Sequence, residues 1–411
     1  MGQGIMPSQS GTNAPGRVLY ASTLMSAETY SALFSRAKVK PSLAAQKYHA
    51  LMTRGLALNG VEVFALSVPP VSQLTSERRF VRLPQERRDG VTYRYLPVLQ
   101  LPAVKHLLVC LGAFITALRF LKKLDYAVCD GLNIALSAGV RMAARLKKRP
   151  CVAIVTDVPE ILAGGRTKTA RLNTKELAKF DGYVLLTEAM NALVNPGGRP
   201  HIVAEGQVDA AMSARENTLE SKSPQKTLLY AGMLHAQYGV LTLAEAFSRV
   251  QDPDARLIFY GDGDAAQTLR GAAARDGRIE LRGVADNETV VKEELEATLL
   301  VNPRPSGEAF TAYSFPSKNL EYMVSGTPVL TTKLSGMPRE YDGYAYLFTD
   351  ESAEGMAKTL EQTLALPREA LHEKGLAAKA FVLANKSNQA QAARVVDLLH
   401  SLQPAHSGVK Q

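Results

Sequence analysis

Residues 297–332 read Ala-Thr-Leu-Leu-Val-Asn-Pro-Arg-Pro-Ser-Gly-Glu-Ala-Phe-Thr-Ala-Tyr-Ser-Phe-Pro-Ser-Lys-Asn-Leu-Glu-Tyr-Met-Val-Ser-Gly-Thr-Pro-Val-Leu-Thr-Thr. The apolar run at 297–301 predicts a buried strand, and a loop rich in Pro, Ser and Gly follows it. A helix is expected to begin near Pro316, and residues 327–331 predict a second strand. This succession is typical of an open parallel sheet, in which ligands bind beyond the carboxyl ends of the strands.

The start of the predicted helix is suited to an anion. A helix N-terminus offers unpaired N–H groups and about half a positive charge. We expect Pro316 to set the first turn, Ser317 to cap it and Lys318 to add a full charge. Arg304 on the preceding loop would supply a second cation. The sequence therefore predicts a phosphate site here.

Glu321 is expected on the same helix face as the anion site, because it follows Lys318 by three residues. Phosphate would repel a carboxylate, whereas the hydroxyls of an adjacent ribose would donate hydrogen bonds to it. The alternative is that Lys318 and Glu321 form an ordinary solvated surface pair.

At these residues the chain resembles the retaining glycosyltransferases of family 4. Residues 321–329, Glu-Tyr-Met-Val-Ser-Gly-Thr-Pro-Val, are similar to that family's donor-site pattern Glu-Ala-Met-Ala-Ser-Gly-Thr-Pro-Val. Residues 313–318, Tyr-Ser-Phe-Pro-Ser-Lys, resemble a bacterial subgroup that builds capsular and exopolysaccharides. The likeness spans about 17–396 and is stronger in the second half.

The resemblance implies an α/β protein of the GT-B fold: two Rossmann-like, doubly wound domains facing across a cleft, with a C-terminal helix returning to the first. It also implies transfer of a sugar from a nucleotide-diphosphate-sugar to a glycan or lipid-linked acceptor, with retention and without a metal or other cofactor. The leaving phosphate would help to take the acceptor proton. The donor-binding residues would include Ser314, Phe315, Pro316 and Ser317.

A second glycine-containing turn at 230–239 reads Tyr-Ala-Gly-Met-Leu-His-Ala-Gln-Tyr-Gly. Gly232 would let the backbone approach a diphosphate closely. The family usually has a basic residue after this glycine and a Lys-Gly further on, but Met233 and Tyr238 stand there. That departure leaves Arg304 and Lys318 to neutralise more of the diphosphate charge. His235 is either a partial substitute for the missing basic residues or an ordinary solvated loop residue.

The run Gly261-Asp-Gly-Asp264 has competing interpretations. It is a weak dinucleotide fingerprint, because the third glycine is missing. It could also be the metal-binding Asp-x-Asp of the other large glycosyltransferase fold, or a glycine turn in which Asp262 caps the next helix. We favour the turn, with Gly261 in the donor site and Val284, at the end of the next strand, against the nucleobase.

In the first half, Asp157 follows a buried strand and is expected to point into the cleft, where it would hold the acceptor hydroxyl or stabilise positive charge on the donor sugar. Helix capping is the alternative. Gln46, Lys47 and His49 are weaker candidates for sugar contacts. We therefore predict Asp157, Arg304, Lys318 and Glu321 as the catalytic set.

The length of 411 residues favours two domains. Strand and helix alternate in each half, and a polar stretch separates them. We predict a disordered tail at 1–16, an acceptor domain at 17–205, a linker at 206–226, a donor domain at 227–386, and the returning helix with a tail at 387–411.

Cysteine usage and charge limit the partners. The three cysteines are widely spaced in the sequence and support neither a disulfide framework nor a zinc site, so a reducing cytosol is expected. The net charge of +9 fits phosphorylated substrates or an anionic membrane surface. No nucleic-acid motif accompanies it.

Residues 101–124 form an apolar stretch flanked by lysines, which is typical of a helix at the inner face of a membrane or, alternatively, of a buried core helix. No run is long enough for a spanning helix. Two other functions stay open: a subunit that binds sugar nucleotides but has weak catalysis, because the basic pair is missing, and a nucleotide-sugar epimerase, for which we identify no acid–base residues.

Overall fold

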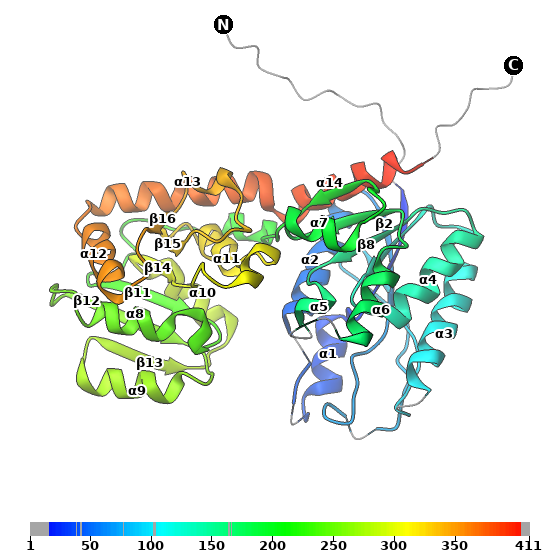
Figure 1. Ribbon diagram of the computed structural model, residues 1–411, viewed down its shortest axis with the longest axis horizontal. Coiled ribbons are helices and arrows are strands. Elements are labelled where there is room, and N and C mark those ends of the chain that lie inside the picture. The colour runs from blue at the N-terminus through cyan, green and yellow to red at the C-terminus, as the bar shows by residue number, and fades with distance from the viewer. Residues whose placement is uncertain are drawn as a thin grey trace, which may run out of the picture.

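The chain folds into two α/β domains (Figure 1). The computed structural model describes residues 16–37, 39–41, 43–76, 78–101, 104–162, 165 and 167–403. The tail predicted at 1–16, apart from Gly16, and the last eight residues of the predicted C-terminal tail lie outside these ranges.

The first domain is built on an eight-stranded sheet with the order β10-β9-β8-β7-β1-β2-β5-β4. Neighbouring strands of this sheet are parallel, except that the edge strand β4 pairs antiparallel with β5. A short antiparallel pair, β3 with β6, lies apart from it. The elements are β1 (Arg17–Ser22), α1 (Ala27–Phe34), α2 (Leu43–Leu58), β2 (Glu62–Ser67), β3 (Phe80–Val81), β4 (Glu86–Arg88), β5 (Val91–Tyr95), β6 (Val98–Leu99), α3 (Lys105–Phe120), β7 (Tyr126–Asp130), α4 (Ile134–Leu146), β8 (Cys151–Val155), α5 (Pro159–Leu162), α6 (Lys168–Leu177), β9 (Gly182–Leu185), α7 (Glu188–Val194) and β10 (His201–Val203).

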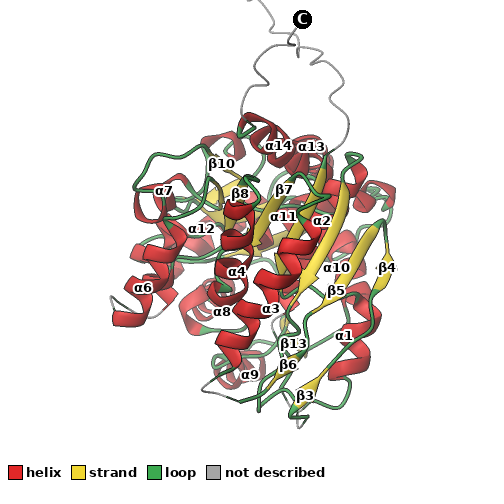
Figure 2. Cartoon of the chain, turned by 90° about the vertical axis from the view of Figure 1, so that its right-hand side faces the viewer, coloured by secondary structure: helices red, strands yellow, loops and turns green. Residues whose placement is uncertain are grey.

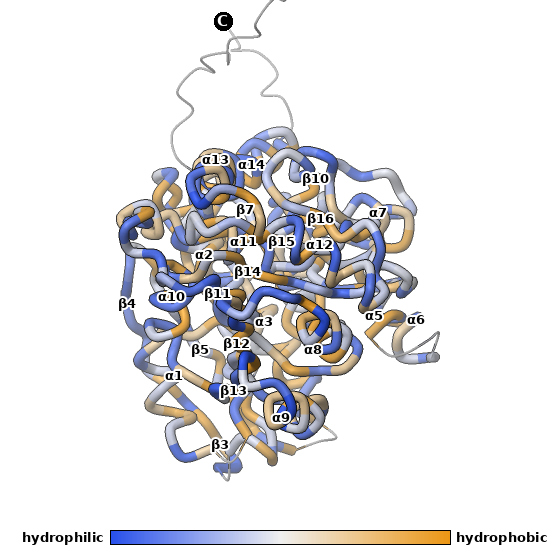
Figure 3. Tube along the Cα trace, turned by 90° about the vertical axis from the view of Figure 1, so that its left-hand side faces the viewer, coloured by the Kyte–Doolittle hydropathy of each residue, from blue (hydrophilic) through white to orange (hydrophobic). Residues whose placement is uncertain are grey.

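The second domain has a six-stranded parallel sheet with the order β13-β12-β11-β14-β15-β16. Figure 3 shows hydropathy changing along α8 and α9, as expected for helices that pack one face on a sheet. The helices and strands are β11 (Lys226–Ala231), α8 (Val240–Phe247), β12 (Ala255–Tyr260), α9 (Ala266–Arg275), β13 (Ile279–Gly283), α10 (Asn287–Glu296), β14 (Leu299–Asn302), α11 (Ser317–Ser325), β15 (Val329–Thr332), β16 (Tyr346–Phe348), α12 (Ala353–Leu364) and α13 (Arg368–Lys386).

The last helix, α14 (Asn388–Ser401), returns to the first domain as predicted, and it packs on α2 (Figure 1). The contact is close at Gly55, where a Cβ would stand 2.1 Å from the backbone oxygen of Asn388. Buried α14 residues such as Val395 belong to the core of the first domain. The doubly wound, two-domain architecture predicted from the sequence is confirmed.

The chain crosses between the domains at two segments that bind each other. The Val208 amide donates to Lys386 O (2.9 Å), and the Asn388 amide donates to Val208 O (2.8 Å). The buried Lys386 ammonium contacts Glu205 Oε1 (2.5 Å) and Glu340 Oε1 (2.6 Å). Residues 206–226, predicted as a linker, pack against the second domain, where the Asn217 amide donates to Ser325 O.

Helix α6 begins at Lys168 because Thr167 caps it by accepting from the Ala170 amide. Helix α3 lies beside α4 (Figure 2). The alternative of a buried core helix is wrong for α3: Val109, Ala113 and Ala117 face inward, while Leu107 is 69% exposed and Leu108, Leu111 and Ile115 also face solvent. Among the described residues no helix has both the length and the apolar character needed to cross a membrane.

Candidate functional site between the two domains

A cavity of about 630 Å³ lies between the domains. Its wall comes from α2 and the 207–215 segment on one side, and from the ends of β11 and β12 with α10 and α11 on the other. β11 and β12 end at this cavity, which agrees with the expectation that ligands bind beyond the carboxyl ends of parallel strands. A volume of this size accommodates a drug-sized or nucleotide-sized ligand.

Lys318 lies on this wall, directly against the turn that carries Gly232. Its ammonium donates to Ala231 O at 2.6 Å. A Cβ on Gly232 would stand 1.6 Å from Lys318 Nζ, and Gly232 has a φ of +152°, so a side chain is excluded here on both counts. Burial lowers the pKa of Lys318, an effect that Glu321 and Glu294 oppose. The predicted pairing of a glycine turn with a lysine is therefore present.

Helix α11 begins without a side-chain cap. Pro316 occupies the N-cap position and Ser317 is the first helical residue, so the prediction that Ser317 caps the helix is wrong. The physical reason is that Pro316, with φ −74° and ψ 90°, lies outside the helical region, while Ser317 is already helical, so the N-cap position falls on a residue that has no side-chain acceptor. The first-turn N–H groups have no side-chain acceptor, as an anion site requires.

Arg304 lies between two aromatic rings, with its guanidinium carbon 5.3 Å from the Tyr238 centroid and 5.0 Å from the Phe310 centroid. Its Nε is buried and finds no hydrogen-bond partner in the part of the chain that the structure describes. Burial lowers its pKa, while Tyr238, Tyr230 and Asp157 oppose that effect. An unpaired N–H on a buried cation is a donor that an anion would satisfy.

Lys318 contacts a different ring from those near Arg304: Lys318 Nζ stands 5.4 Å from the centre of the Tyr230 ring. Burial raises the pKa of Tyr230, and the charge of Arg304 opposes this rise. Lys318 lines the cavity, whereas Arg304 does not. Arg304 therefore lies beyond the cavity wall.

Asp157 follows β8 in the first domain and does not line the donor cavity. Burial raises the pKa of the Asp157 carboxyl, and the charge of Arg304 opposes this effect. Helix α5 begins two residues later, at Pro159. The role of Asp157 in the cleft stays a prediction.

Glu321 forms an ion pair across the cleft. Lys47 Nζ stands 2.7 Å from Glu321 Oε1, and both residues line the cavity. The alternative of a surface pair between Lys318 and Glu321 is therefore wrong, because Lys318 contacts Ala231 O instead. Gln46 and His49 are structural: Gln46 bonds the backbone at Met25 and Thr23, and the buried His49 ring contacts Tyr20 Oη (2.7 Å).

The buried cavity residue Glu294 was not predicted. It projects from α10, is 6% exposed, lines the cavity and has no side-chain hydrogen bond among the described residues. Burial, with a further contribution from Glu321, raises its pKa to about 8, while Lys47 and Lys318 oppose the rise. Its sequence context, a run of glutamates in a helix, is typical of a solvated surface, so no local signal marks it.

The glycine turns at 232 and 261 pack on each other. Gly261 has a φ of +129°, and a Cβ there would stand 1.8 Å from Gly232 O. Val284 is 79% exposed on the wall of the same cavity, where it leaves an apolar surface for a base. Asp262 does not cap α9, which has Ala265 at its N-cap position, because the Asp262 carboxylate accepts from the Gly263 amide of its own turn.

Five predicted donor residues lie away from the cavity wall: His235, Ser314, Phe315, Pro316 and Ser317. His235 contacts the Asp264 carboxylate at 3.4 Å and the Tyr238 ring. Phe315 is buried against Tyr341, so it supports the loop through packing. Ser314 has a buried Oγ without a partner. Sequence order placed these residues near the site, whereas the direction of each side chain depends on tertiary packing.

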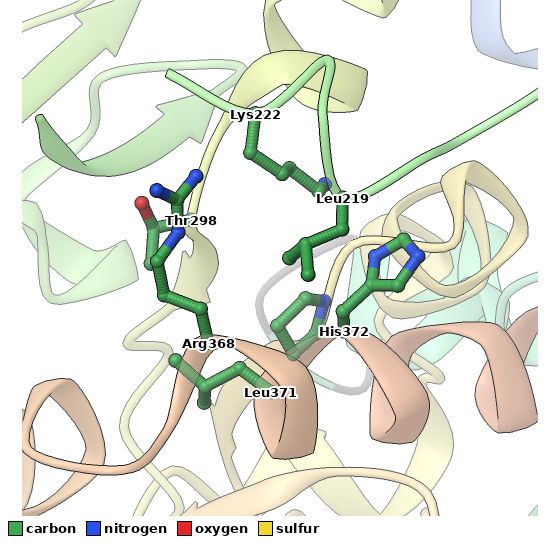
Figure 4. A pocket seen from close by; sticks show the side chains of 7 residues that line it. Leu219, Lys222, Thr298, Arg368, Leu371 and His372 are labelled. Atoms are coloured by element: carbon green, nitrogen blue, oxygen red, sulfur yellow. The ribbon is translucent and has the colours of Figure 1, made fainter. Parts of the chain in front are cut away.

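The small pocket of Figure 4 is not a comparable site. Its volume is about 10 Å³, which is room for one water molecule. Lys222 there donates to Leu295 O (2.7 Å) and Thr327 Oγ1 (2.6 Å), and burial lowers its pKa to about 7. These bonds attach the 206–226 segment to the second domain.

The two facing Rossmann-like domains and the returning helix define the GT-B fold. HepE of Anabaena, solved in complex with UDP, has a TM-score of 0.64 and 14% identity, covering 94% of this chain and 100% of that one. Sucrose-phosphate synthase of Thermosynechococcus elongatus has a TM-score of 0.64 and 13% identity, with 94% and 99% covered. A UDP-forming α,α-trehalose-phosphate synthase of Burkholderia xenovorans has a TM-score of 0.63 and 12% identity, with 95% and 100% covered.

Residues 225–365, about a third of the chain, match the family described as Glycosyl transferases group 1. This match covers most of the second domain and agrees with the resemblance seen at 321–329. A search of curated proteins found no match.

Proposed function

We propose that this protein is a glycosyltransferase that moves a sugar from a nucleotide-diphosphate-sugar to a glycan or lipid-linked acceptor. The observation that carries the proposal is the convergence of Lys318, in the first turn of α11, and the Gly232 turn on one wall of the interdomain cavity. A lysine and a glycine turn, beside a helix start that has no side-chain cap among the described residues, together suit a diphosphate.

The chemistry follows from where charge develops. Breaking the bond between the sugar and the diphosphate leaves negative charge on the leaving phosphate, while the sugar carbon becomes cation-like. Lys318, Arg304 and the α11 N-terminus would stabilise the leaving group electrostatically. Asp157 would hold the acceptor hydroxyl or stabilise the positive sugar from the opposite domain.

The finer features of the reaction are also part of the proposal. Retention of the anomeric configuration and metal-independent catalysis follow from the family resemblance. The leaving phosphate would itself take the acceptor proton, so no protein nucleophile is required. A role in capsular or exopolysaccharide synthesis rests on the Tyr-Ser-Phe-Pro-Ser-Lys variant at 313–318.

A uridine donor is the first candidate. HepE was solved with UDP-glucose, and the trehalose-phosphate synthase is named as UDP-forming. The cavity wall between Gly232 and Val284 carries Glu294 and Glu321, which are acceptors or, when protonated, donors for ribose hydroxyls.

Peripheral membrane binding is the second part of the proposal. The exposed leucines of α3 alternate with inward residues, and exposed Lys122 and Lys123 follow the helix. An apolar face next to cations suits an anionic bilayer. Sedimentation with anionic vesicles at low salt tests it: the Leu107→Ser and Leu111→Ser double variant should remain in the supernatant, and equal sedimentation of both proteins would contradict the proposal.

A sugar-nucleotide-binding subunit with weak catalysis is the alternative. It is motivated by the absence of basic side chains at Met233 and Tyr238. In the structure Tyr238 instead supports Arg304 from one side, so the position still contributes to holding a cation. Hydrolysis or transfer of a labelled donor by the purified protein would exclude this alternative.

The deciding experiment is a thermal-shift panel of nucleoside diphosphates and sugar nucleotides, followed by assay of any stabilising donor with radiolabelled sugar. We expect Lys318→Ala to lower turnover at least tenfold with the fold intact, because one donor to the diphosphate is lost. Lys333→Ala is the matched control, since Lys333 pairs with Asp342 on the surface of the same domain. Near-normal turnover of Lys318→Ala would refute the assigned role.

A further inference from the structure

A second hollow lies in the first domain, with a volume of about 500 Å³. It is distinguished by the number of its basic side chains. Its wall consists of Arg141, Arg145, Lys148, Arg149, Pro150, Lys179, Asp181, Arg199, Pro200 and Leu402. These residues come from α4, the turns before β8, β9 and β10, and the end of the described chain, so the fold assembles the cluster from separate segments.

This basic pocket lies at the amino ends of the strands, whereas the donor cavity lies beyond carboxyl ends of strands. Pro150, Asp181 and Pro200 each stand immediately before a strand, so they mark the amino ends of β8, β9 and β10. Asp157 follows β8 at its carboxyl end. An anion bound in the basic pocket would therefore be separate from the donor diphosphate.

The charges of the basic pocket are not balanced within the described part of the chain. Glu176 pairs with both Arg141 (2.9 Å) and Lys179. The Asp181 carboxylate accepts from the Cys151 amide. The remaining cations have no ion pair among the described residues; they are Arg145, Lys148, Arg149 and Arg199.

One donor of the basic pocket is buried and unsatisfied. Within the described ranges Arg141 Nε has no hydrogen-bond partner, and its side chain is 13% exposed. A buried N–H without a partner costs free energy unless a ligand supplies an acceptor. Together with the mutual repulsion of the unpaired cations, this indicates a site made for a multivalent anion.

We propose that the basic pocket binds a phosphate-bearing ligand. Guanidinium groups bind phosphate oxygens through two parallel hydrogen bonds, and three of the four unpaired cations are arginines. The phosphate can belong to a soluble phosphorylated molecule or to the headgroup of an anionic lipid. The chemistry is the same in both cases, and two experimental arms separate the sources.

The first arm measures inorganic pyrophosphate binding by calorimetry at low salt. The background is Lys318→Ala, so that the donor cavity contributes little. The pocket variant adds Arg145→Ser, Arg149→Ser and Arg199→Ser, and the control variant adds Arg79→Ser, Arg82→Ser and Arg87→Ser, three exposed arginines of the same domain. We expect the pocket variant to lose at least tenfold in affinity and the control to lose less than threefold.

The second arm measures sedimentation with phosphatidylcholine vesicles that contain phosphatidylglycerol. If the phosphate comes from lipid, the pocket triple variant in the wild-type background sediments less than the control triple variant. If it comes from a soluble molecule, only the calorimetric difference appears. Equal behaviour of pocket and control variants in both arms overturns the proposal.

The proposed transferase activity is tested separately. Nucleoside diphosphate binding by the pocket triple variant should equal that of the wild-type protein, because none of its three arginines lines the donor cavity. If the wild-type protein binds pyrophosphate in the basic pocket but binds no nucleotide, the proposed function is refuted and the proposal for the basic pocket stands.

Discussion

Replacing Glu294 by glutamine should change how stability depends on pH. The carboxyl is buried in the donor cavity beside Glu321, Lys47 and Lys318, and the buried Tyr322 hydroxyl lies near it. Burial raises its pKa to about 8 from the ordinary 4.5. At neutral pH the side chain is therefore mostly protonated in the fold and ionised in the unfolded chain.

The sign and size of the effect follow from that difference. The folded state holds the proton more tightly, so the stabilisation is fully present below pH 4.5 and is lost as pH rises through 8. With these two pKa values, full ionisation in the fold costs at most about 5 kcal/mol, and the loss between pH 5 and pH 8 is about 3 kcal/mol. Glutamine is uncharged throughout and should remove this dependence.

The assay is urea unfolding of the wild-type protein and the Glu294→Gln variant at pH 5.0, 6.5 and 8.0. The quantity of interest is the difference between their free energies of unfolding, because other titrating groups cancel in it. Relative to the wild-type protein, the variant should gain stability by about 3 kcal/mol between pH 5 and pH 8. Glu296→Gln, on the same helix but half exposed, is the control and should show no such trend. A constant difference for Glu294→Gln would refute a protonated carboxyl.

Three further predictions use the same geometry. Gly232→Ala should weaken nucleoside diphosphate binding at least tenfold in calorimetry, because a Cβ would displace Lys318 Nζ, whereas Gly277→Ala has open space and should bind normally. Lys47→Ala should change the free energy of unfolding by less than about 1 kcal/mol, since its pair with Glu321 is half exposed; a loss above 2 kcal/mol in urea would show a larger structural role. The wild-type protein should gain stability between pH 7 and pH 9, because the pKa of Lys222 is lowered to about 7 and the buried ammonium loses its charge as pH rises. Lys222→Met should abolish this gain. Parallel pH profiles of the two proteins would contradict the prediction.

Much of the fold was predictable because hydrophobic periodicity is local. The strands β1, β8 and β12 are largely apolar runs, and α14 lies within the segment 387–411 predicted for the returning helix. Missed elements have weaker patterns. The edge strand β4 reads Glu-Arg-Arg and forms only because it can pair with β5. Helix α1 depends on Ser26 as its cap, and Glu86 of β4 supports that serine.

The chain's order of residues was enough to predict a candidate anion site, because Gly232, the 316–318 segment and Arg304 each carry a local signature of turn, helix start or charge. Only the tertiary structure decided which side chains reach the cavity. It paired Glu321 with Lys47 over 274 positions of sequence, turned Phe315 into the core and buried Glu294 among charges. The physical reason is that secondary structure follows from neighbours along the chain, whereas burial and electrostatic environment depend on segments that meet only when both domains are packed.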